Sequence, residues 1–447
     1  MNRRMKWIGL LSLLPILALF VFIVFICYRE SIASSELKQK LDKMRLAGEP
    51  FDNDSMAKFF EKISHKEGTM AWTEVLELSR ASTANQLISA DLPFIGIGKL
   101  PLDLRPASEW PDEPRIAEFL REVRPVIQRV LKADVFPKPV WMPIEFNGFS
   151  TLLGPIDDSR TTARLLELDA IHALYHQEGE RALSDIFAMH SVADAFDWRL
   201  FIVANLSSIA LQGTQQSTIN RSLSMNVWNE VQLAALSAQV NQPYGVINAW
   251  KTAFSGERGM AYSSMDDLSS IDPTNYKNNL LYMLPVLPST RLSILRSYER
   301  LQCCADAGES ELAARVNQAT AEVLLENGLI SQRYLYLSLM FPGGTAMAYA
   351  IDRHEMDRRL TYTSLAVKRF QLKNKRWPEK LSALTDVGLL QKDWTTTENQ
   401  PFGFEVKGEC AYVWSYEAYK EKSVSASRPV VDLESPEVSL SFMVTIR

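Results

Sequence analysis

The chain has 447 residues, of which 47% are hydrophobic and 23% are charged, and its formal net charge is -5. This composition is globular and excludes a disordered chain, because it supplies enough apolar side chains for a large core. A mildly acidic chain also has no electrostatic drive toward phosphate backbones, so no nucleic-acid partner is expected.

The N-terminus predicts a membrane anchor. Arg3, Arg4 and Lys6 precede the stretch from Trp7 to Tyr28, which is about 22 residues without a charge and long enough to cross a bilayer. The basic flank should stay in the cytoplasm, which predicts a single-pass protein of the cytoplasmic (inner) membrane with its body outside. A signal peptide cleaved near Ser31-Ile32-Ala33 is the alternative, but the apolar core exceeds the usual length, which favours an uncleaved anchor.

Apolar residues at helical spacing predict an extracytoplasmic helical domain over residues 34–375. Its centre is a helical hairpin over 158–211 that turns at Glu178-Gly179-Glu180, with a second helix buried on most sides. Two segments, YHQEGERALSDIFA and CADAGESELAARVNQ, each place Gly-Glu between two predicted helices and an Ala shortly after it, as tetratricopeptide hairpins do. The segments do not recur at a fixed period, which predicts an irregular array of hairpins. The remaining predicted helices span 34–46, 55–63, 71–89, 114–132, 223–239, 246–263, 289–305, 310–326, 329–340 and 345–373. Pro125 should kink or break the helix over 114–132.

The pattern of apolar residues changes at Arg376-Trp377-Pro378, from long helical stretches to short segments with strand spacing. A short helix over 379–385 and strands near 402–406, 411–416, 430–433 and 438–446 are expected, and the last strand alternates apolar with polar residues. The fold class predicted is therefore mainly α, with an anchor over 1–33, a helical domain over 34–375 and a small antiparallel α+β module over 376–447. The four cysteines form no disulfide framework, and Cys303 and Cys304 are expected as small buried side chains.

The candidate site residues are Asp169, His172, His176 and Glu180. Their spacings of three, four and four place them on one side of a helix, and histidines at i and i+4 can share a metal ion. His190, on the following helix, is expected opposite the Asp169 end. Glu180 falls in the turn, however, and no general base is visible, so ordinary hydrogen-bonded histidines are the favoured interpretation. No metal or other cofactor is assigned.

The extracytoplasmic part resembles a family of uncharacterised bacterial proteins with an N-terminal membrane anchor and a helical body. The phrases that carry the resemblance are MRLAGEPF, ARLLELDAIHALYHQEGERALSDI, FSGERGMA, LAVKRFQLKNKRWPEKLSAL and QPFGFEVKGECAYVWSYE. The resemblance implies this architecture and supplies no activity or catalytic residues. Within it, Gly256-Glu257-Arg258-Gly259 is interpreted as a helix terminus with a structural ion pair, and Arg258 as partly buried against the central hairpin.

The C-terminal piece also resembles the globular head of pilin-like secretion proteins, although the anchor lacks their processing site and no Asp-rich metal loop follows the strands. The leading functional interpretation is a cell-envelope scaffold or protein-interaction module that binds another envelope protein. One alternative is an envelope hydrolase, metal-dependent through His172 and His176. The other is an accessory component of a secretion or pilus-like assembly. The sequence leaves the oligomeric state open.

Overall fold

The fold is known from a computed structural model that describes residues 3–83, 91–101, 103–242, 245–266, 287–308, 311–326, 342–397, 399–415 and 443–447. Side chains are described from residue 17 onward, except that of Pro342. Most of these residues are helical, and a three-stranded antiparallel sheet in the order β1-β2-β3 lies near the C-terminus. The predicted fold class is confirmed. The predicted helix at 329–340 and the predicted strand at 430–433 lie outside the described residues.

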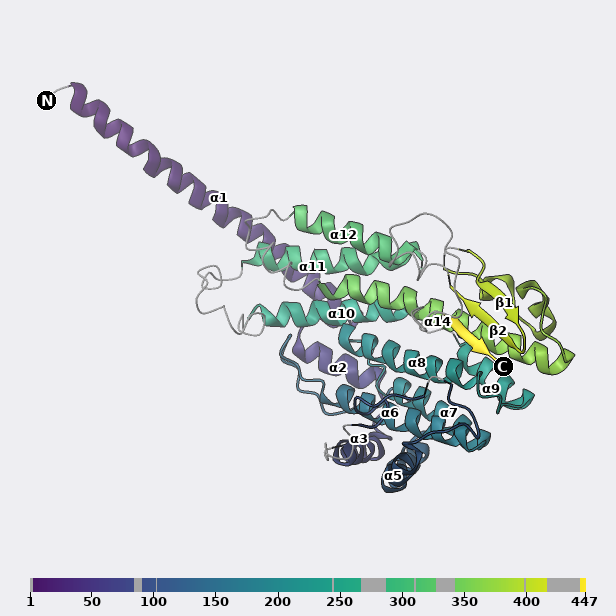
Figure 1. Ribbon diagram of the computed structural model, residues 1–447. Helices are drawn as coiled ribbons and strands as arrows, with labels where there is room; N and C mark the ends of the chain where they lie inside the picture. The colour runs from purple at the N-terminus through teal and green to yellow at the C-terminus, as the bar shows by residue number, and fades with distance from the viewer. Residues whose placement is uncertain are drawn as a thin grey trace.

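The helices form a stack, with the sheet at the end of the body away from the N-terminus (Figure 1). The α-helices are α1 (Arg3–Ala47), α2 (Asn53–Ile63), α3 (Thr69–Thr83), α5 (Glu113–Ala133), α6 (Gly154–Tyr175), α7 (Gly179–Ala195), α8 (Ile202–Ser222), α9 (Glu230–Val240), α10 (Val246–Ser264), α11 (Pro288–Cys303), α12 (Leu312–Glu326) and α14 (Pro342–Asn374). The 3-10 helices are η4 (Cys304–Ala307), η6 (Leu381–Val387) and η7 (Gln391–Trp394), and the strands are β1 (Gly403–Lys407), β2 (Cys410–Trp414) and β3 (Met443–Ile446). The stack runs from α11 and α12, beside α1, to α3 and α5, with α14 packed between α12 and α8 (Figure 1).

The centre of the body is the predicted hairpin, formed by α6 and α7. Every residue of α6 from Leu165 to Leu174 is buried, so this helix is surrounded by protein on all sides. The turn depends on Gln177, whose φ of 63° is left-handed, and Gly179 opens α7. The expected second helix is in fact two, because the chain leaves helical geometry between Ala195 and Ile202 before α8 begins.

Two clusters of buried apolar side chains make up the core. The larger one joins α3, α5, α6, α7, α8 and the C-terminal half of α14. It also includes Leu384, Val413 and Ile446, so the C-terminal sheet packs on the same core as the helices. The smaller cluster joins α10, α11, α12 and the first turns of α14. It lies next to α1.

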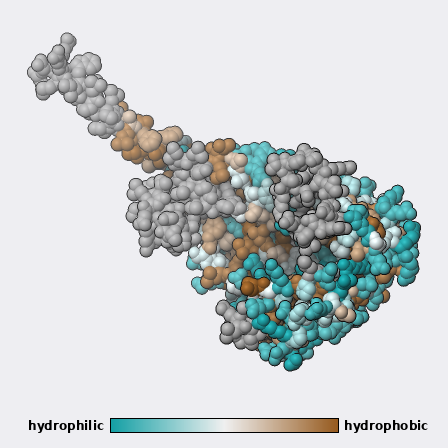
Figure 2. Space-filling model, in the orientation of Figure 1, coloured by the Kyte–Doolittle hydropathy of each residue, from teal (hydrophilic) through white to brown (hydrophobic). Residues whose placement is uncertain are grey.

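Helix α1 has two different halves. Its apolar side chains between Leu17 and Tyr28, apart from the half-buried Ile26, are exposed and form the brown stem in Figure 2. Farther along, Ala33, Leu37 and Met44 are buried, and their spacing of four and seven residues forms one stripe that faces the body. Among the described residues this is the one helix long and apolar enough to cross a membrane, and it fits a single-pass anchor or a signal sequence.

The Gly-Glu-Arg-Gly segment lies in the middle of α10 and is not a helix terminus, which corrects the prediction. Gly256 is required by the close approach of a backbone carbonyl, whereas Gly259 faces the flexible Met56 side chain. A Cβ on Gly256 would come within 1.8 Å of the Leu200 carbonyl oxygen, and one on Gly259 within 2.7 Å of Met56 Sδ. The segment is therefore where α10 meets the start of α8 on one side and α2 on another.

Three further predictions differ from the structure in whole or in part. The helix expected from residue 223 begins at Glu230, where Asn229 and Gln232 form a capping box. Helix α5 continues across Pro125 as a single helix, so the chain does not break there. Cys303 is exposed while Cys304 is buried, so only one of the pair contributes to the core, and neither is in a disulfide.

Candidate functional sites

Two of the predicted site residues, His172 and His176, come together in the structure. They lie in the last turn and at the C-cap of α6, and their ring centroids are 4.5 Å apart. Both Nε2 atoms are within hydrogen-bonding distance of the same atom, Oε1 of Glu113, at 3.1 Å from His172 and 3.0 Å from His176. Glu113 is the first residue of α5. The cluster therefore joins the beginning of one helix to the end of another.

Packing around the cluster fixes its position. Pro114 directly follows Glu113 and presets the helical backbone at the start of α5. Tyr175 donates its hydroxyl hydrogen to the Ser108 carbonyl at 2.7 Å, and the Trp110 ring lies 6.3 Å from that of His172. These contacts hold the segment before α5 against the end of α6, so Glu113 reaches the histidines without rearrangement.

The electrostatics of the cluster follow from its partial burial. The side chain of His172 is 9% exposed, and this burial lowers its pKa. Burial works in the opposite direction on Glu113, but hydrogen bonds from His176 and His172 outweigh it and lower the pKa of that carboxyl. Glu113 is therefore ionised at neutral pH. The Glu113 carboxylate lies at the N-terminus of α5, where the helix dipole favours a negative charge. The histidines lie at the C-terminus of α6, where the dipole favours a positive charge.

Asp169 does not join the histidines, which corrects the expected four-residue set. It is fully buried and accepts a hydrogen bond from Arg124 Nη1 at 2.6 Å, and Arg181 also pairs with it. The neighbouring carboxyl of Asp185 is buried as well, and desolvation together with Asp169 raises its pKa well above the usual range. Asp169 thus belongs to an ionic network that ties α5, α6 and α7 together.

Glu180 and His190 also point elsewhere. Glu180 Oε1 accepts a hydrogen bond from Gln232 Nε2 at 2.7 Å, so it contacts α9. His190 Nε2 lies 3.5 Å from Asp194 Oδ2 in its own helix. Glu113 was missed by sequence reasoning because it lies 59 positions before His172. The one available signal was its place in the first turn of a helix, where acidic residues are common for reasons of the dipole alone.

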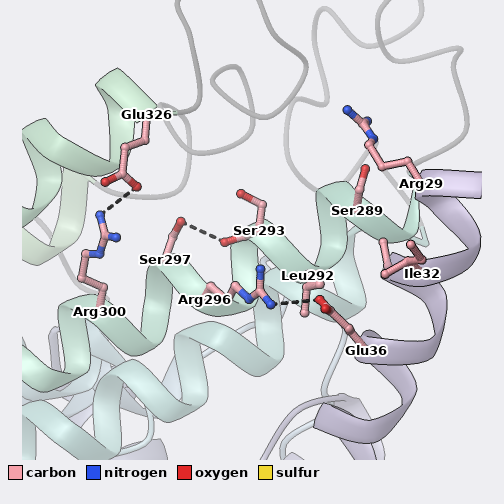
Figure 3. A pocket seen from close by; sticks show the side chains of 11 residues that line it. Arg29, Ile32, Glu36, Ser289, Leu292, Ser293, Arg296, Ser297, Arg300 and Glu326 are labelled. Atoms are coloured by element: carbon pink, nitrogen blue, oxygen red, sulfur yellow. Dashed lines mark hydrogen bonds and ion pairs between the residues drawn. The ribbon is translucent and has the colours of Figure 1, made fainter. Parts of the chain in front are cut away.

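A second candidate site is a groove of about 500 Å³ where α1 reaches the body (Figure 3). Arg29, Ile32, Ala33 and Glu36 line it from α1. Its other wall is α11, with Glu326 at the end of α12, and consists of Ser289, Leu292, Ser293, Arg296, Ser297 and Arg300. Arg296 pairs with Glu36 at 3.0 Å and Arg300 with Glu326 at 2.9 Å. The groove is therefore polar, and it begins next to the apolar stem.

The two walls of this groove are parallel helices held in register. Glu30 Oε2 accepts the backbone N–H of Ser289 at 2.9 Å, and Glu30 Oε1 accepts the Ser289 hydroxyl at 2.7 Å. Lys40 Nζ pairs with Glu299 Oε2 at 2.5 Å. The partners of Glu30, Glu36 and Lys40 lie 259, 260 and 259 positions later, and this constant offset means that α1 and α11 run in the same direction. Glu30 acts as a cap for the N-terminus of α11.

Arg258 fastens the far end of α1 to the body. Its side chain is 2% exposed, and Nη2 donates to Glu49 Oε2 at 2.6 Å and to the Pro50 carbonyl at 3.4 Å. Nη1 lies 3.9 Å from Glu299 Oε1 on α11. Arg258 is thus buried as expected, but it contacts the turn after α1 rather than the central hairpin.

The neighbouring Glu257 is also buried. Its Oε1 accepts the backbone N–H of Ile202 at 3.0 Å, which satisfies a donor at the start of α8. Burial raises the pKa of Glu257 to about 7. The two central residues of the motif therefore connect α10 to different elements.

Neither a protein-family model, nor a curated protein, nor a solved structure matches this chain. The resemblance to uncharacterised membrane-anchored proteins therefore stays a prediction, and function has to be argued from geometry.

Proposed function

We propose that this protein is a cell-envelope scaffold, anchored in the cytoplasmic membrane by α1, whose helical body binds another envelope protein. The observation that supports this most is the docking of α1 on α11. A flexible tether would let the body tumble, whereas a helix continuous with the membrane span and capped, paired and packed on the body holds one face at a constant height above the bilayer. A fixed orientation is useful for organising a membrane neighbour.

The contacts of Glu30 support an uncleaved anchor. Glu30 lies just before the candidate cleavage site Ser31-Ile32-Ala33, and its carboxylate caps α11. Ala33 is itself buried against the body. Cleavage there would remove the cap and leave the buried stripe of α1 without its first turns. The basic residues Arg3, Arg4 and Lys6 favour a cytoplasmic N-terminus and an extracytoplasmic body.

The groove between α1 and α11 is the surface that we propose for the partner. A membrane protein beside α1 would bring its own juxtamembrane segment to the same height as Arg29, Ser293 and Arg296. Juxtamembrane segments are commonly charged, and the groove offers three arginines, two glutamates and three serines as paired or hydrogen-bonding groups. The proposed occupant is therefore a charged segment of a second membrane-anchored protein.

Site-specific photo-crosslinking in cells tests this function. A photoreactive amino acid is placed at Ser293 in the groove of the full-length chain, and at Val231 as a matched control. Val231 is 78% exposed and lies on α9, toward the sheet end of the body (Figure 1). The expected result is a discrete adduct with one membrane protein from Ser293 and none from Val231.

Adducts at Ser293 with lipid alone, or an identical set of adducts from both positions, would contradict the scaffold proposal. An adduct with a second copy of the chain from Ser293 would also contradict it as stated, because the proposed partner is a different protein.

Two alternatives remain predictions. An envelope hydrolase would use His172 and His176, which lie beside the Glu113 carboxylate. Loss of a hydrolytic activity of the wild type in a His172→Ala/His176→Ala chain would favour this alternative.

An accessory role in a secretion or pilus-like assembly rests on the C-terminal sheet, and deletion of Arg376–Arg447 should then abolish association with that assembly. The shared apolar core makes destabilisation of the body a second expected effect of that deletion.

A further inference from the structure

Three metal-binding atoms converge at the junction of α5 and α6. Nε2 of His172 and Nε2 of His176 lie 3.1 and 3.0 Å from Oε1 of Glu113, and the three residues each offer a ligand atom within 4.8 Å of the other two. We propose that Glu113, His172 and His176 form a Zn²⁺ site in which the ion replaces the hydrogen bonds now centred on Oε1. The proposal is independent of the partner proposed above.

The distances are close to those of a tetrahedral site. Zn–N and Zn–O bonds are about 2.0–2.2 Å, so two ligand atoms on a tetrahedral ion lie about 3.3–3.5 Å apart. Oε1 of Glu113 therefore has to move away from each ring nitrogen by only a few tenths of an ångström. One ligand atom from each residue lies within 4.8 Å of the other two, so the set has to contract by at most about 1.5 Å, which rotation of His176 can supply because its side chain is 41% exposed.

The surrounding structure holds the ligands in place without the ion. The network of Asp169 with Arg124 and Arg181 ties α5, α6 and α7 together near the histidines. The hydrogen bond from Tyr175 to Ser108 fixes the segment that leads into Glu113. A site on helices that are already joined costs little conformational entropy to complete.

The ligand chemistry favours zinc. Two imidazoles and one carboxylate are nitrogen and oxygen donors of the kind that Zn²⁺ binds, whereas Mg²⁺ and Ca²⁺ require mostly oxygen ligands. Three protein ligands leave a fourth position, and solvent reaches the site because the His176 side chain is 41% exposed. Water would complete the coordination in the isolated protein. A donor side chain from another protein could take its place.

Metal content of the purified full-length chain tests the site. After removal of metal with a chelator, the protein in detergent is dialysed against Zn²⁺ and its zinc content is measured; Co²⁺ serves as a second probe, because tetrahedral Co²⁺ absorbs strongly in the visible range. The variants are Glu113→Gln and His176→Asn, both at partly exposed positions, and the matched control is His190→Asn on α7. Circular dichroism verifies that each variant is folded.

We expect one zinc per chain in the wild type and in His190→Asn. Since changes to outer-shell partners alone weaken metal sites by 10- to 100-fold, loss of a direct ligand should weaken binding by more than about 100-fold in Glu113→Gln and His176→Asn. The proposal is overturned if the wild type binds less than one zinc at saturation. It is equally overturned if folded Glu113→Gln and His176→Asn bind zinc as tightly as the wild type, or if His190→Asn loses it to the same degree.

Discussion

Substitution of Arg258 tests whether the turn after α1 is fastened to the body as the structure indicates. Arg258→Ala removes a buried stem, the charge-assisted hydrogen bond to Glu49 at 2.6 Å and the weaker one to the Pro50 carbonyl. Truncation of a buried large side chain costs about 2–5 kcal/mol, and a hydrogen bond to a charged group is worth about 1.5–3 kcal/mol. Release of the guanidinium from a desolvated position offsets part of this loss.

The groups left behind by Arg258→Ala determine how much the free energy of unfolding falls. The Glu49 side chain is 48% exposed, so it regains water when Arg258 is removed, and Glu299 keeps its pair with Lys40. We therefore expect Arg258→Ala to lower the free energy of unfolding by about 2–4 kcal/mol. Arg258→Met is the matched control because it keeps the stem and removes only the charge, and its cost should be about half or less.

Denaturant unfolding of the full-length chain in detergent, followed by helical circular dichroism, measures both variants. Equal losses in Arg258→Ala and Arg258→Met would mean that the charge alone matters and that packing of the stem contributes nothing. An Arg258→Ala chain as stable as the wild type would refute the reasoning, because it would leave the buried contacts between α10, α11 and the turn after α1 without energetic consequence.

Two further predictions concern the same helix. Gly256→Ala should lower the free energy of unfolding by at least about 2 kcal/mol in denaturant, because its Cβ would meet the Leu200 carbonyl oxygen. The control, Gly213→Ala in α8, meets nothing within 4 Å and should be neutral or stabilising. Equal effects of the two substitutions would refute the close approach. Because burial raises the pKa of Glu257 from 4.5 to about 7, the folded chain keeps a proton that the unfolded chain releases, so stability falls as pH rises through this window, by up to about 3 kcal/mol. Glu257→Gln should show a smaller fall than the wild type in pH-dependent unfolding curves, because Glu167 and Asp357 also have raised pKa values and remain. An unchanged slope would contradict the assignment.

Helices and strands were predictable where one periodic pattern dominated. The stretch that became α10 and the alternation around β3 are read directly from the positions of apolar residues. The break between α7 and α8 was hidden because Phe196, Trp198, Leu200 and Phe201 are all buried, so the apolar pattern runs through a non-helical connection. The start of α9 was visible in principle, since Asn229 and Gln232 have the spacing of a capping box.

Two of the three residues of the candidate metal set could be predicted and the third could not. Spacing on one helix correctly grouped His172 with His176, because residues four apart share a helix face. The same spacing wrongly included Asp169, whose charge is taken by Arg124 and Arg181 from two other helices. Glu113 could not be found, since only the tertiary packing of α5 on α6 brings it to the histidines.

The joint between α1 and the body was also beyond sequence reasoning. The pairs of Glu30, Glu36 and Lys40 with residues of α11 span about 260 positions, and no local pattern relates them. The buried stripe of Ala33, Leu37 and Met44 is a signal that could have indicated a docked helix, although not what it docks on.

The central claim is that α1 and the body form one unit of fixed orientation, and a distance measurement between them tests it most directly. Spin labels are placed at exposed Tyr28 on α1 and exposed Leu325 on α12, in a full-length chain with Cys27→Ser, Cys303→Ser and Cys410→Ser, reconstituted into lipid nanodiscs. Pulsed electron resonance should give one narrow distance distribution, which broadens when Glu30→Ala and Glu36→Ala are added. A broad or multiple distribution in the chain with Glu30 and Glu36 intact would contradict the claim, because the body would then move independently of its anchor.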